Sequence, residues 1–351
     1  MPIDVLVVGQ GLAGSLLAWQ LLREGFSVLV IDDGQQNASQ VAAGLINPVT
    51  GQRLVKSANV DVLLPIAMAC YRELAGFFQQ RFFMPLPMCR VLSSENMRRV
   101  AEQRLEDPEY QLYLDGLSEQ MGEVVAEHGL LKQRQTGYLR TEALLACLRQ
   151  YFVEQQAYRQ VSLDYADIQL EGSLSWQDIR PRQIVFCEGH HARHNLWFGG
   201  LPFQVAKGEI LECHSPIMNG NVILNFGDWL LPLDQGRFKL GATFEANFSK
   251  AEVSPEARLR LLRTLAKRLP ALAEVEVIDQ RAGIRPTTQD KQPFMGTHPR
   301  YPRLQIFNGF GAKGSLMIPG YARYFVAWLR QRMPLPKHCD IQRYHETCFP
   351  A

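Results

Sequence analysis

Three glycines and one carboxylate near the N-terminus have a spacing that suits a phosphate-containing ligand. Gly9, Gly11 and Gly14 form the pattern G-x-G-x-x-G, and Asp32 follows roughly 20 residues later. Gly9 permits a tight turn, Gly11 lets a pyrophosphate approach the backbone, and Gly14 lets a following helix pack closely against a strand. A carboxylate at position 32 can accept a hydrogen bond from a ribose hydroxyl. These residue types at these distances predict dinucleotide binding.

The elements expected around these glycines are the ones that such a site needs. Residues 5–8 form a continuous apolar run, which is typical of a strand buried on both faces of a parallel sheet. An apolar-periodic helix follows the glycines, and its N-terminus offers free N–H groups and the positive end of a helix dipole to phosphates. A second apolar run at 28–31 ends in Asp32. The alternative is a tight strand–helix turn that binds no ligand.

Other clusters of reactive side chains carry less information. His190, His191 and His194 lie close together, but no cysteine or carboxylate ligands accompany them at the spacing of a metal site, so we expect no metal. Seven cysteines are scattered without a C-x-x-C pair, a usage typical of free thiols in a reducing cytosol. No Ser-His-Asp or paired-carboxylate arrangement can be argued from this sequence.

Length and charge narrow the class of protein. At 351 residues the chain exceeds the usual size of a single hydrophobic core, which favours two domains. A net charge of +2 gives no electrostatic footprint for nucleic acid. The N-terminus has no basic n-region, and no run of about 18 apolar residues could span a membrane. We therefore expect a cytoplasmic protein without a membrane span.

A second strand–glycine turn–helix unit is predicted near the C-terminus, at 304–330. Loops that follow strand ends converge in open α/β sheets, so we expect this unit and the N-terminal unit to face one cofactor. The segments between them then hold a second domain that is inserted into the first. Within it, residues 94–128 are highly charged, and we expect them to be mostly helical.

Several segments occur in a fixed order along the chain. They are VLVVGQGLAG at 5–14, VAAGLIN at 41–47, QVAKGEIL at 204–211, LLPLDQGRFKLGATF at 230–244, AGIRPTTQDKQPFMG at 282–296 and NGFGAKGSLMIPG at 308–320. Together they resemble the D-amino-acid oxidase superfamily of flavoproteins, particularly its glycine oxidase branch. The same order is also similar to the flavin domain of the bifunctional enzymes that modify wobble uridine in transfer RNA, although we expect no partner methyltransferase domain here.

The resemblance implies an α/β fold in which a Rossmann-type FAD-binding domain is interleaved with a mostly antiparallel α+β substrate domain. The FAD-binding domain would be discontinuous and comprise residues 1–81, 136–205 and 278–351. The substrate domain would comprise residues 82–135 and 206–277.

The resemblance also implies that the cofactor is FAD and that no covalent bond holds it. Family members with covalent flavin attach it through a cysteine near the arginine motif, where this chain has Gly283. The residues implied at the FAD site are Gly9, Gly11, Leu12, Ala13, Gly14, Asp32, Asp33, Ala38, Ser39, Ala43, Gly44, Leu45, Leu163, Gly189, Phe310, Gly311, Ala312, Lys313, Gly314, Ser315 and Leu316. The assignment of the last seven, Phe310 to Leu316, to the flavin also has a physical reason that does not depend on the resemblance. Loop amides and a helix N-terminus suit the negative charge of a reduced flavin.

On the substrate side, Arg285 aligns with the arginine that grips the substrate carboxylate in the amino-acid-oxidising members. A guanidinium forks onto two carboxylate oxygens and does not lose its charge, so it can fix the alpha carbon over the flavin. The alternative is a structural arginine that pairs with Asp279 or Asp290.

Two further positions depart from the family pattern. Relatives carry an arginine in the final glycine loop, where this chain has Ala312 and then Lys313, which either supplies the charge or extends into solvent. Asp228 and Trp229 stand where glycine oxidase has a tyrosine over the substrate, so Trp229 either roofs the site or packs in the core.

We therefore expect an FAD-dependent oxidoreductase that oxidises a C–N bond of an amine or amino-acid-like substrate by hydride transfer to flavin N5. The electron acceptor stays open. One alternative is an FAD-dependent enzyme that modifies a transfer-RNA base, carboxymethylaminomethyl-uridine, although the charge does not support transfer RNA as a partner. The other is a flavin-binding redox or assembly protein with little turnover.

Overall fold

The parallel sheet that the N-terminal motif predicts is present in the computed structural model, which describes residues 1–248 and 250–349. The sheet has six strands in the order β11-β2-β1-β14-β21-β20, and all neighbours are parallel except β20 and β21. Their bounds are β1 (Pro2–Val8), β2 (Val28–Asp32), β11 (Tyr158–Gln160), β14 (Arg180–Phe186), β20 (Phe294–Thr297) and β21 (Leu304–Asn308).

The first strand is apolar at successive positions because both faces of this sheet are covered. Val5 and Val7 belong to one core cluster, and Leu6 and Val8 belong to another. The first cluster includes side chains of α1 (Leu12–Arg23), α3 (Val60–Phe78), α5 (Thr141–Glu154) and α7 (Gly314–Leu329). The second includes the hairpin of β12 (Ile168–Gln169) and β13 (Ser175–Trp176), with Cys348 of α8 (His345–Cys348) packed against it.

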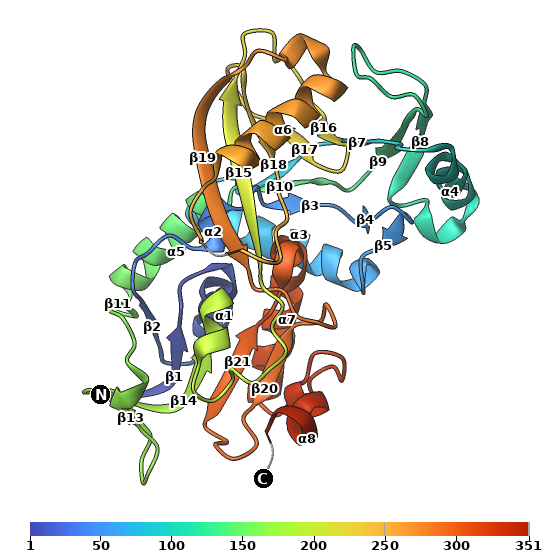
Figure 1. Ribbon diagram of the computed structural model, residues 1–351. Coiled ribbons are helices and arrows are strands. Elements are labelled where there is room, and N and C mark those ends of the chain that lie inside the picture. Colours follow the sequence, from blue (N-terminus) through green and yellow to red (C-terminus); the bar gives the residue numbers. More distant parts are fainter. Residues whose placement is uncertain (249, 350–351) are drawn as a thin grey trace.

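A larger, mostly antiparallel sheet forms the upper part of the molecule in Figure 1. Its order is β19-β15-β18-β17-β16-β7-β9-β8, and only β7 and β16 run parallel. The bounds are β7 (Met88–Val91), β8 (Leu114–Ser118), β9 (Leu130–Gln133), β15 (Ala206–His214), β16 (Ile223–Asn225), β17 (Trp229–Pro232), β18 (Arg237–Gly241) and β19 (Glu276–Arg285). Leu261 and Leu265 of α6 (Pro255–Arg268) pack on one face, against Leu211 and Phe238.

Short elements lie between the two large sheets (Figure 1). They are α2 (Ala38–Val41), the three-stranded sheet of β3 (Leu45–Ile46), β10 (Gly137–Leu139) and β6 (Phe83–Pro85), and the hairpin of β4 (Val49–Thr50) and β5 (Val55–Lys56). Val41 and Ala43 share a core cluster with Met88 and Ile210 of the larger sheet. The second face of that sheet is therefore turned toward the N-terminal unit.

The prediction that residues 94–128 are mostly helical is wrong beyond the first turns. Helix α4 (Glu95–Glu106) ends before Pro108, which opens a short 3₁₀ turn, because a proline ring disfavours helical backbone at the preceding residue. Residues 114–118 form β8 instead, which pairs with β9. The partner strand β9 lies outside residues 94–128, so the sequence pattern within that segment could not indicate the pairing.

The expected α/β fold class, with a Rossmann-type sheet and a mostly antiparallel second sheet, is confirmed. The proposed domain boundaries stay a prediction. The predicted boundary places residues from 278 onward in the FAD-binding domain. In the structure, however, all of β19 from Glu276 to Arg285 pairs with β15 of the larger sheet. No helix among the described residues is both long enough and apolar enough to cross a membrane.

Candidate FAD and substrate site

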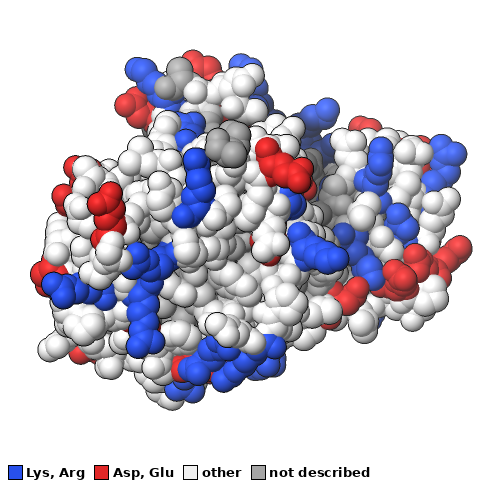
Figure 2. All heavy atoms as spheres, turned by 90° about the horizontal axis from the view of Figure 1, so that it is seen from below, with Lys and Arg blue, Asp and Glu red and all other residues white. Residues whose placement is uncertain are grey.

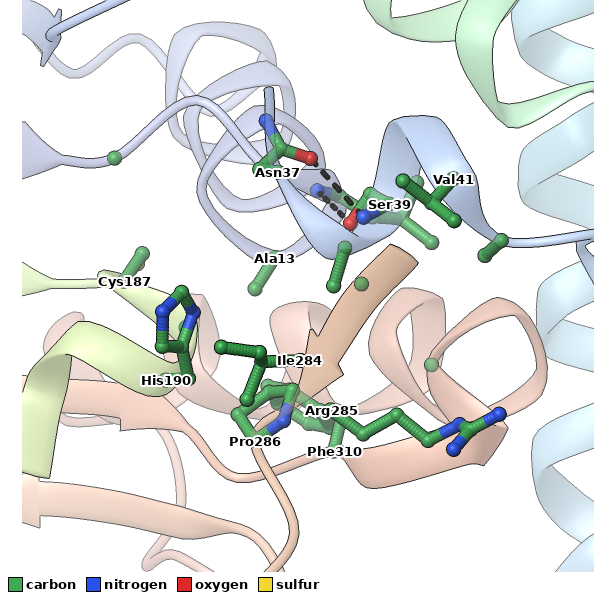
Figure 3. Close-up of a pocket in the computed structure, with 18 of the residues that line it drawn as sticks. Ala13, Asn37, Ser39, Val41, Cys187, His190, Ile284, Arg285, Pro286 and Phe310 are labelled. Carbon is green, nitrogen blue, oxygen red and sulfur yellow. Dashed lines mark hydrogen bonds between the residues drawn. The ribbon is translucent and has the colours of Figure 1, made fainter. Parts of the chain in front are cut away.

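A cleft of about 440 Å³ lies where the N-terminal glycine turn, α2 and the larger sheet meet. Figure 3 shows side chains from these elements turned toward a common space. The expected residues that line the cleft are Gly9, Gly11, Leu12, Ala13, Asp32, Asp33, Ala38, Ser39, Ala43, Gly44, Leu45, Leu163, Gly189, Trp229, Arg285, Phe310, Gly311, Ala312, Gly314 and Ser315. Three expected residues, Gly14, Lys313 and Leu316, do not line it.

The three glycines of the motif serve different purposes. Gly9 has a φ of +102°, and a Cβ there would lie 2.7 Å from the carbonyl oxygen of Cys187. A Cβ on Gly14 would collide with the carbonyl of Gly9, so this glycine allows α1 to approach the turn. A Cβ on Gly11 would make only an ordinary contact, 3.5 Å from Ser39 Oγ. The protein itself therefore does not need a glycine at position 11, whereas a ligand at the helix N-terminus would.

The N-terminus of α1 faces the same space. Gly11 is the N-cap and makes no side-chain cap hydrogen bond. The N–H of Leu12 donates to Ser39 Oγ at 3.1 Å, and Asn37 accepts from Ser39 N at 3.0 Å (Figure 3). Gly11 itself provides no side-chain cap, and the positive end of the helix dipole suits a pyrophosphate, so these residues fit the phosphate part of FAD.

Both acids at the end of β2 are held by backbone amides. Asp32 accepts from Gln10 N at 2.8 Å and from Gly34 N at 2.9 Å, and Asp33 accepts from Gln35 N at 2.9 Å. These bonds fix both side chains at the rim of the cleft, where a ribose could reach them.

Close backbone packing shapes the far side of the cleft. Gly44 has a φ of +68°, and a Cβ there would collide with the carbonyl of Leu139. A Cβ on Gly283 would lie 3.2 Å from Val41 Cβ. Gly309 and Gly311 also have positive φ angles, of +83° and +55°, in the turn before α7. Because these positions carry no side chain, they would let a planar ring system approach the backbone.

Arg285, at the end of β19, is partly buried and has no acidic partner among the described residues. Its Nη1 donates to the carbonyl oxygens of Thr243 at 3.1 Å and of Lys207 at 3.4 Å. Its guanidinium carbon lies 5.8 Å from the ring centroid of Phe244. Burial lowers the pKa of Arg285. In Figure 3 its side chain extends away from Cys187 and His190, on the opposite side of the view.

The two acids named as structural partners for Arg285 pair with other arginines instead. Asp290 pairs with Arg343 at 2.9 Å, and Asp279 pairs with Arg281 at 2.6 Å. The guanidinium of Arg285 is therefore a cation in the cleft whose charge no carboxylate of the described residues balances.

Lys313 lies at the N-cap of α7 but points toward the β4–β5 hairpin. Its Nζ is 3.0 Å from Ser57 Oγ and 3.2 Å from Thr50 Oγ1, so the side chain does not extend into solvent. Burial lowers its pKa. Leu316, one turn further, packs in the main core.

Trp229 lines the cleft, and its indole lies over Gly241, where a Cβ would be 2.9 Å from the ring. Its neighbour Asp228 is buried and pairs with Arg260 at 2.8 Å. Asp228 therefore faces away from the expected tyrosine position, and only Trp229 is available to the cleft.

Other lining residues were not expected from the sequence. Among them, Glu188 accepts from Tyr165 Oη at 2.7 Å and from Asn195 Nδ2 at 2.8 Å, and burial raises its pKa. Burial lowers the pKa of His190 to about 4. Asn37 could have been found, because with Gln40 it forms a capping box, and N-x-x-Q is a known start signal of a helix. No cluster of potential metal ligands occurs at 1–248 or 250–349.

A family model described as DAO, FAD dependent oxidoreductase, matches residues 4–328 of the chain. Among curated proteins, the chain is 28% identical over 350 residues to the tRNA 5-methylaminomethyl-2-thiouridine biosynthesis bifunctional protein MnmC of Caulobacter sp. strain K31. This match covers 96% of the chain but 56% of that protein, so the chain spans about half the length of this relative. It is 24% identical to glycine oxidase of Geobacillus kaustophilus, with 90% of each protein covered.

Solved structures show the same fold. Glycine oxidase from Geobacillus kaustophilus superposes with a TM-score of 0.82 at 20% identity and covers 98% of both chains. Iminodiacetate oxidase from Chelativorans sp. BNC1 superposes with a TM-score of 0.79 at 21% identity, covering 97% of this chain and 98% of the other.

Proposed function

The chain belongs to the DAO family of FAD-dependent oxidoreductases, and from this premise we propose that it oxidises a C–N bond of an amine or amino-acid-like substrate. When bound, FAD supplies the acceptor for the hydride that leaves the carbon next to nitrogen.

One observation carries the proposal: among the described residues, the partly buried guanidinium of Arg285 at the cleft donates hydrogen bonds only to carbonyl oxygens. A buried charge without a counter-ion is costly, and a substrate carboxylate would provide the missing one. A guanidinium holds such a carboxylate with two hydrogen bonds and so fixes the adjacent carbon in one position. The pose would then be set by Arg285 on one side and by the indole of Trp229 on the other.

The FAD would be held without a covalent bond. The N–H groups at Gly11 and Ala13 would hold the pyrophosphate, with Leu12 beside it, and Asp32 would hold the adenosine ribose. The flat backbone near Gly44 and the turn before α7 would take the flavin ring. Lys313, close behind that turn, would add positive charge near the reduced ring.

We assign no side chain as a general base. An amine that binds in its neutral form needs none, because the nitrogen lone pair assists hydride departure. The protein then contributes orientation and exclusion of water rather than proton transfer.

Anaerobic mixing of the purified, FAD-loaded protein with a panel of amines and amino acids tests this function. Bleaching of the yellow flavin by compounds that carry a carboxylate next to the C–N bond is the expected result. A flavin that no member of the panel reduces would favour a flavin-binding protein with little turnover. Adding oxygen, quinone or a protein acceptor to the reduced enzyme then identifies what reoxidises it.

The similarity to MnmC supports a second candidate, in which a modified transfer-RNA base carries the C–N bond. The charge of the protein gives little support to transfer RNA as the substrate, because the net charge is only +2. Figure 2 shows one face of the molecule, on which Lys and Arg side chains are interspersed with Asp and Glu rather than gathered in one basic area. Flavin bleaching by transfer RNA that carries carboxymethylaminomethyl-uridine, but not by free amino acids, would select this candidate.

A cytoplasmic location is part of the same proposal. All seven cysteines of the chain are free thiols in the described structure, as in proteins of reducing compartments.

A further inference from the structure

The chain that follows β18 continues to pair with β15, but in a shifted register. Gly241 at the end of β18 is opposite Ile210, and Glu245 is opposite Lys207. The step from Gly241 to Glu245 is four residues, whereas the step from Ile210 to Lys207 is three. One extra residue therefore lies on the side of β18, as in a β-bulge. Bulges are frequent next to active sites, where they re-aim side chains.

The pairing of Thr243 with Glu209, within this shifted stretch, is irregular. Lys207 and Glu245 form a regular pair, in which each N–H donates to the carbonyl oxygen of the other residue at 2.9 Å. Thr243 N–H likewise donates to the carbonyl oxygen of Glu209 at 3.1 Å, but Glu209 N–H donates to Thr243 Oγ1 at 2.8 Å. A regular antiparallel pair would use the carbonyl oxygen of Thr243 for this second bond. The hydroxyl of Thr243 therefore replaces its own carbonyl in the ladder.

The carbonyl oxygen of Thr243 accepts a hydrogen bond from Arg285 instead. Arg285 Nη1 donates to it at 3.1 Å and to the carbonyl oxygen of Lys207 at a longer 3.4 Å. An Nη group carries two hydrogens, so these two acceptors use both. Within the described residues, Nε and Nη2 donate to no protein acceptor, and neither is fully enclosed. The Nε–Nη2 edge of Arg285 is therefore free to hold the two oxygens of a carboxylate.

A buried ion pair holds the segment that carries Thr243 against β15. Lys207 Nζ lies 3.1 Å from the carboxylate of Glu209 and 3.3 Å from that of Glu245. It also donates to the carbonyl oxygen of Glu252 at 3.1 Å. Lys207, Glu209 and Thr243 are all buried. Because these contacts fix the surrounding backbone, the direction of the Thr243 carbonyl depends on the local ladder bonds.

We propose that Thr243 is a positioning residue for the carboxylate anchor: its hydroxyl completes the ladder, so that its carbonyl oxygen engages Nη1 of Arg285. This inference rests on the proposed function, because it concerns the same anchor. With Nη1 occupied by protein carbonyls, Nε and Nη2 hold the substrate carboxylate through two hydrogen bonds. Thr243 is not among the described residues that line the cleft, so it acts through Arg285.

Binding of unreactive carboxylates to the FAD-loaded enzyme tests this role without catalysis. The probes are acetate and butyrate, with the neutral acetamide and butyramide as analogues that lack the charge. Dissociation constants come from flavin absorbance changes or calorimetry. Thr243→Val should weaken carboxylate binding about 10-fold or more, because the unpaired N–H of Glu209 recruits the Thr243 carbonyl and withdraws it from Arg285. Amide binding should stay within about 2-fold, since amides carry no charge for the guanidinium to hold.

Three comparisons separate positioning from a general loss of stability. Thr243→Ser keeps the hydroxyl and should bind carboxylates within about 2-fold of the wild type. Thr136→Val is the matched control, since Thr136 is 4% exposed against 7% for Thr243 and its hydroxyl donates to the carbonyl oxygen of Leu86 at 2.7 Å. It should lower the melting temperature but not carboxylate affinity. Adding Thr243→Val to Arg285→Leu should change carboxylate affinity by less than about 2-fold, because Thr243 acts through Arg285.

An unchanged carboxylate affinity in Thr243→Val would overturn the inference. So would equal losses for carboxylates and amides, which indicate a structural role. If Thr243→Val retains no FAD, Thr243→Ala, which also lacks the hydroxyl, decides by the same criteria, and loss of FAD in both variants would count against positioning. A wild type whose carboxylate affinity does not depend on Arg285 would overturn the anchor of the proposed function instead, so the two failures are distinguishable.

Discussion

The guanidinium of Arg285 occupies the space that a side chain at Gly208 would need. A Cβ built on Gly208 would collide with three atoms of that guanidinium. Gly208 on β15 is opposite Gly283 on β19, so the side chain of Arg285 folds back across the neighbouring strand. The missing side chain at position 208 therefore sets the path of the proposed carboxylate anchor.

Gly208→Ala should displace this anchor without disturbing the FAD site. We expect the substrate concentration for half-maximal flavin reduction to rise by about 10-fold or more, since a shift of the guanidinium breaks its two-pronged contact. Flavin content should stay at one per chain. Gly76→Ala in α3 is the control, because a Cβ there meets no atom within 4 Å. Equal half-saturation in Gly208→Ala and Gly76→Ala would show that the position of Arg285 is unimportant.

Gly11→Val should abolish retention of FAD while the protein still folds. The two added methyl groups would occupy the space that the pyrophosphate needs, but a Cβ at this position makes only ordinary contacts with the protein. Flavin absorbance per chain after purification gives the first readout, and circular dichroism of the apoprotein gives the second. Stoichiometric FAD in a folded Gly11→Val protein would place the phosphates elsewhere.

The FAD should come off without breaking a covalent bond. Residue 283 is a glycine, so it has no side chain that could attach the flavin. A Cβ added at this position would contact Val41. Acid precipitation should release intact FAD into the supernatant, where chromatography identifies it. Yellow colour that stays in the precipitated protein, or release of NAD, would contradict this prediction.

Lys313→Met should lower the two-electron potential of the flavin and weaken sulfite binding. A cation near the ring stabilises the anionic reduced form and the N5–sulfite adduct, and no carboxylate in the described part of the chain neutralises Lys313. The measurements are a dye-linked redox titration and a sulfite titration. Lys337→Met, which removes an exposed lysine, serves as the control. If potential and sulfite affinity match the wild type, Lys313 only ties α7 to the β4–β5 hairpin.

The part of the site that was predictable from sequence lies in short, contiguous segments. The turn from Gly9 to Gly14 and the acid at position 32 belong to one strand–helix–strand unit, so local pattern and elementary backbone geometry were enough. The loop before α7 was predictable for the same reason.

What sequence could not give depends on which distant side chains meet. Whether Asp290 is a counter-ion for Arg285 depends on Arg343, which lies 53 positions further along the chain and forms an ion pair with Asp290. The pairing of β7 with β16, more than a hundred residues later in the chain, was equally beyond the local sequence pattern. The strand at 114–118 was missed for the same reason, because β9 and not the local sequence determines it.

The rate of anaerobic flavin reduction in wild type and Arg285→Leu tests the central claim most directly. Loss of a charge-assisted pair in a desolvated site costs on the order of 2–5 kcal/mol, so the variant should keep its FAD but reduce it about 30-fold or more slowly with the best amino-acid substrate. Arg285→Lys should recover only part of the rate, and Arg281→Leu, which breaks an ion pair on the same strand, should match the wild type. Reduction of Arg285→Leu at the wild-type rate at every substrate concentration would contradict the account.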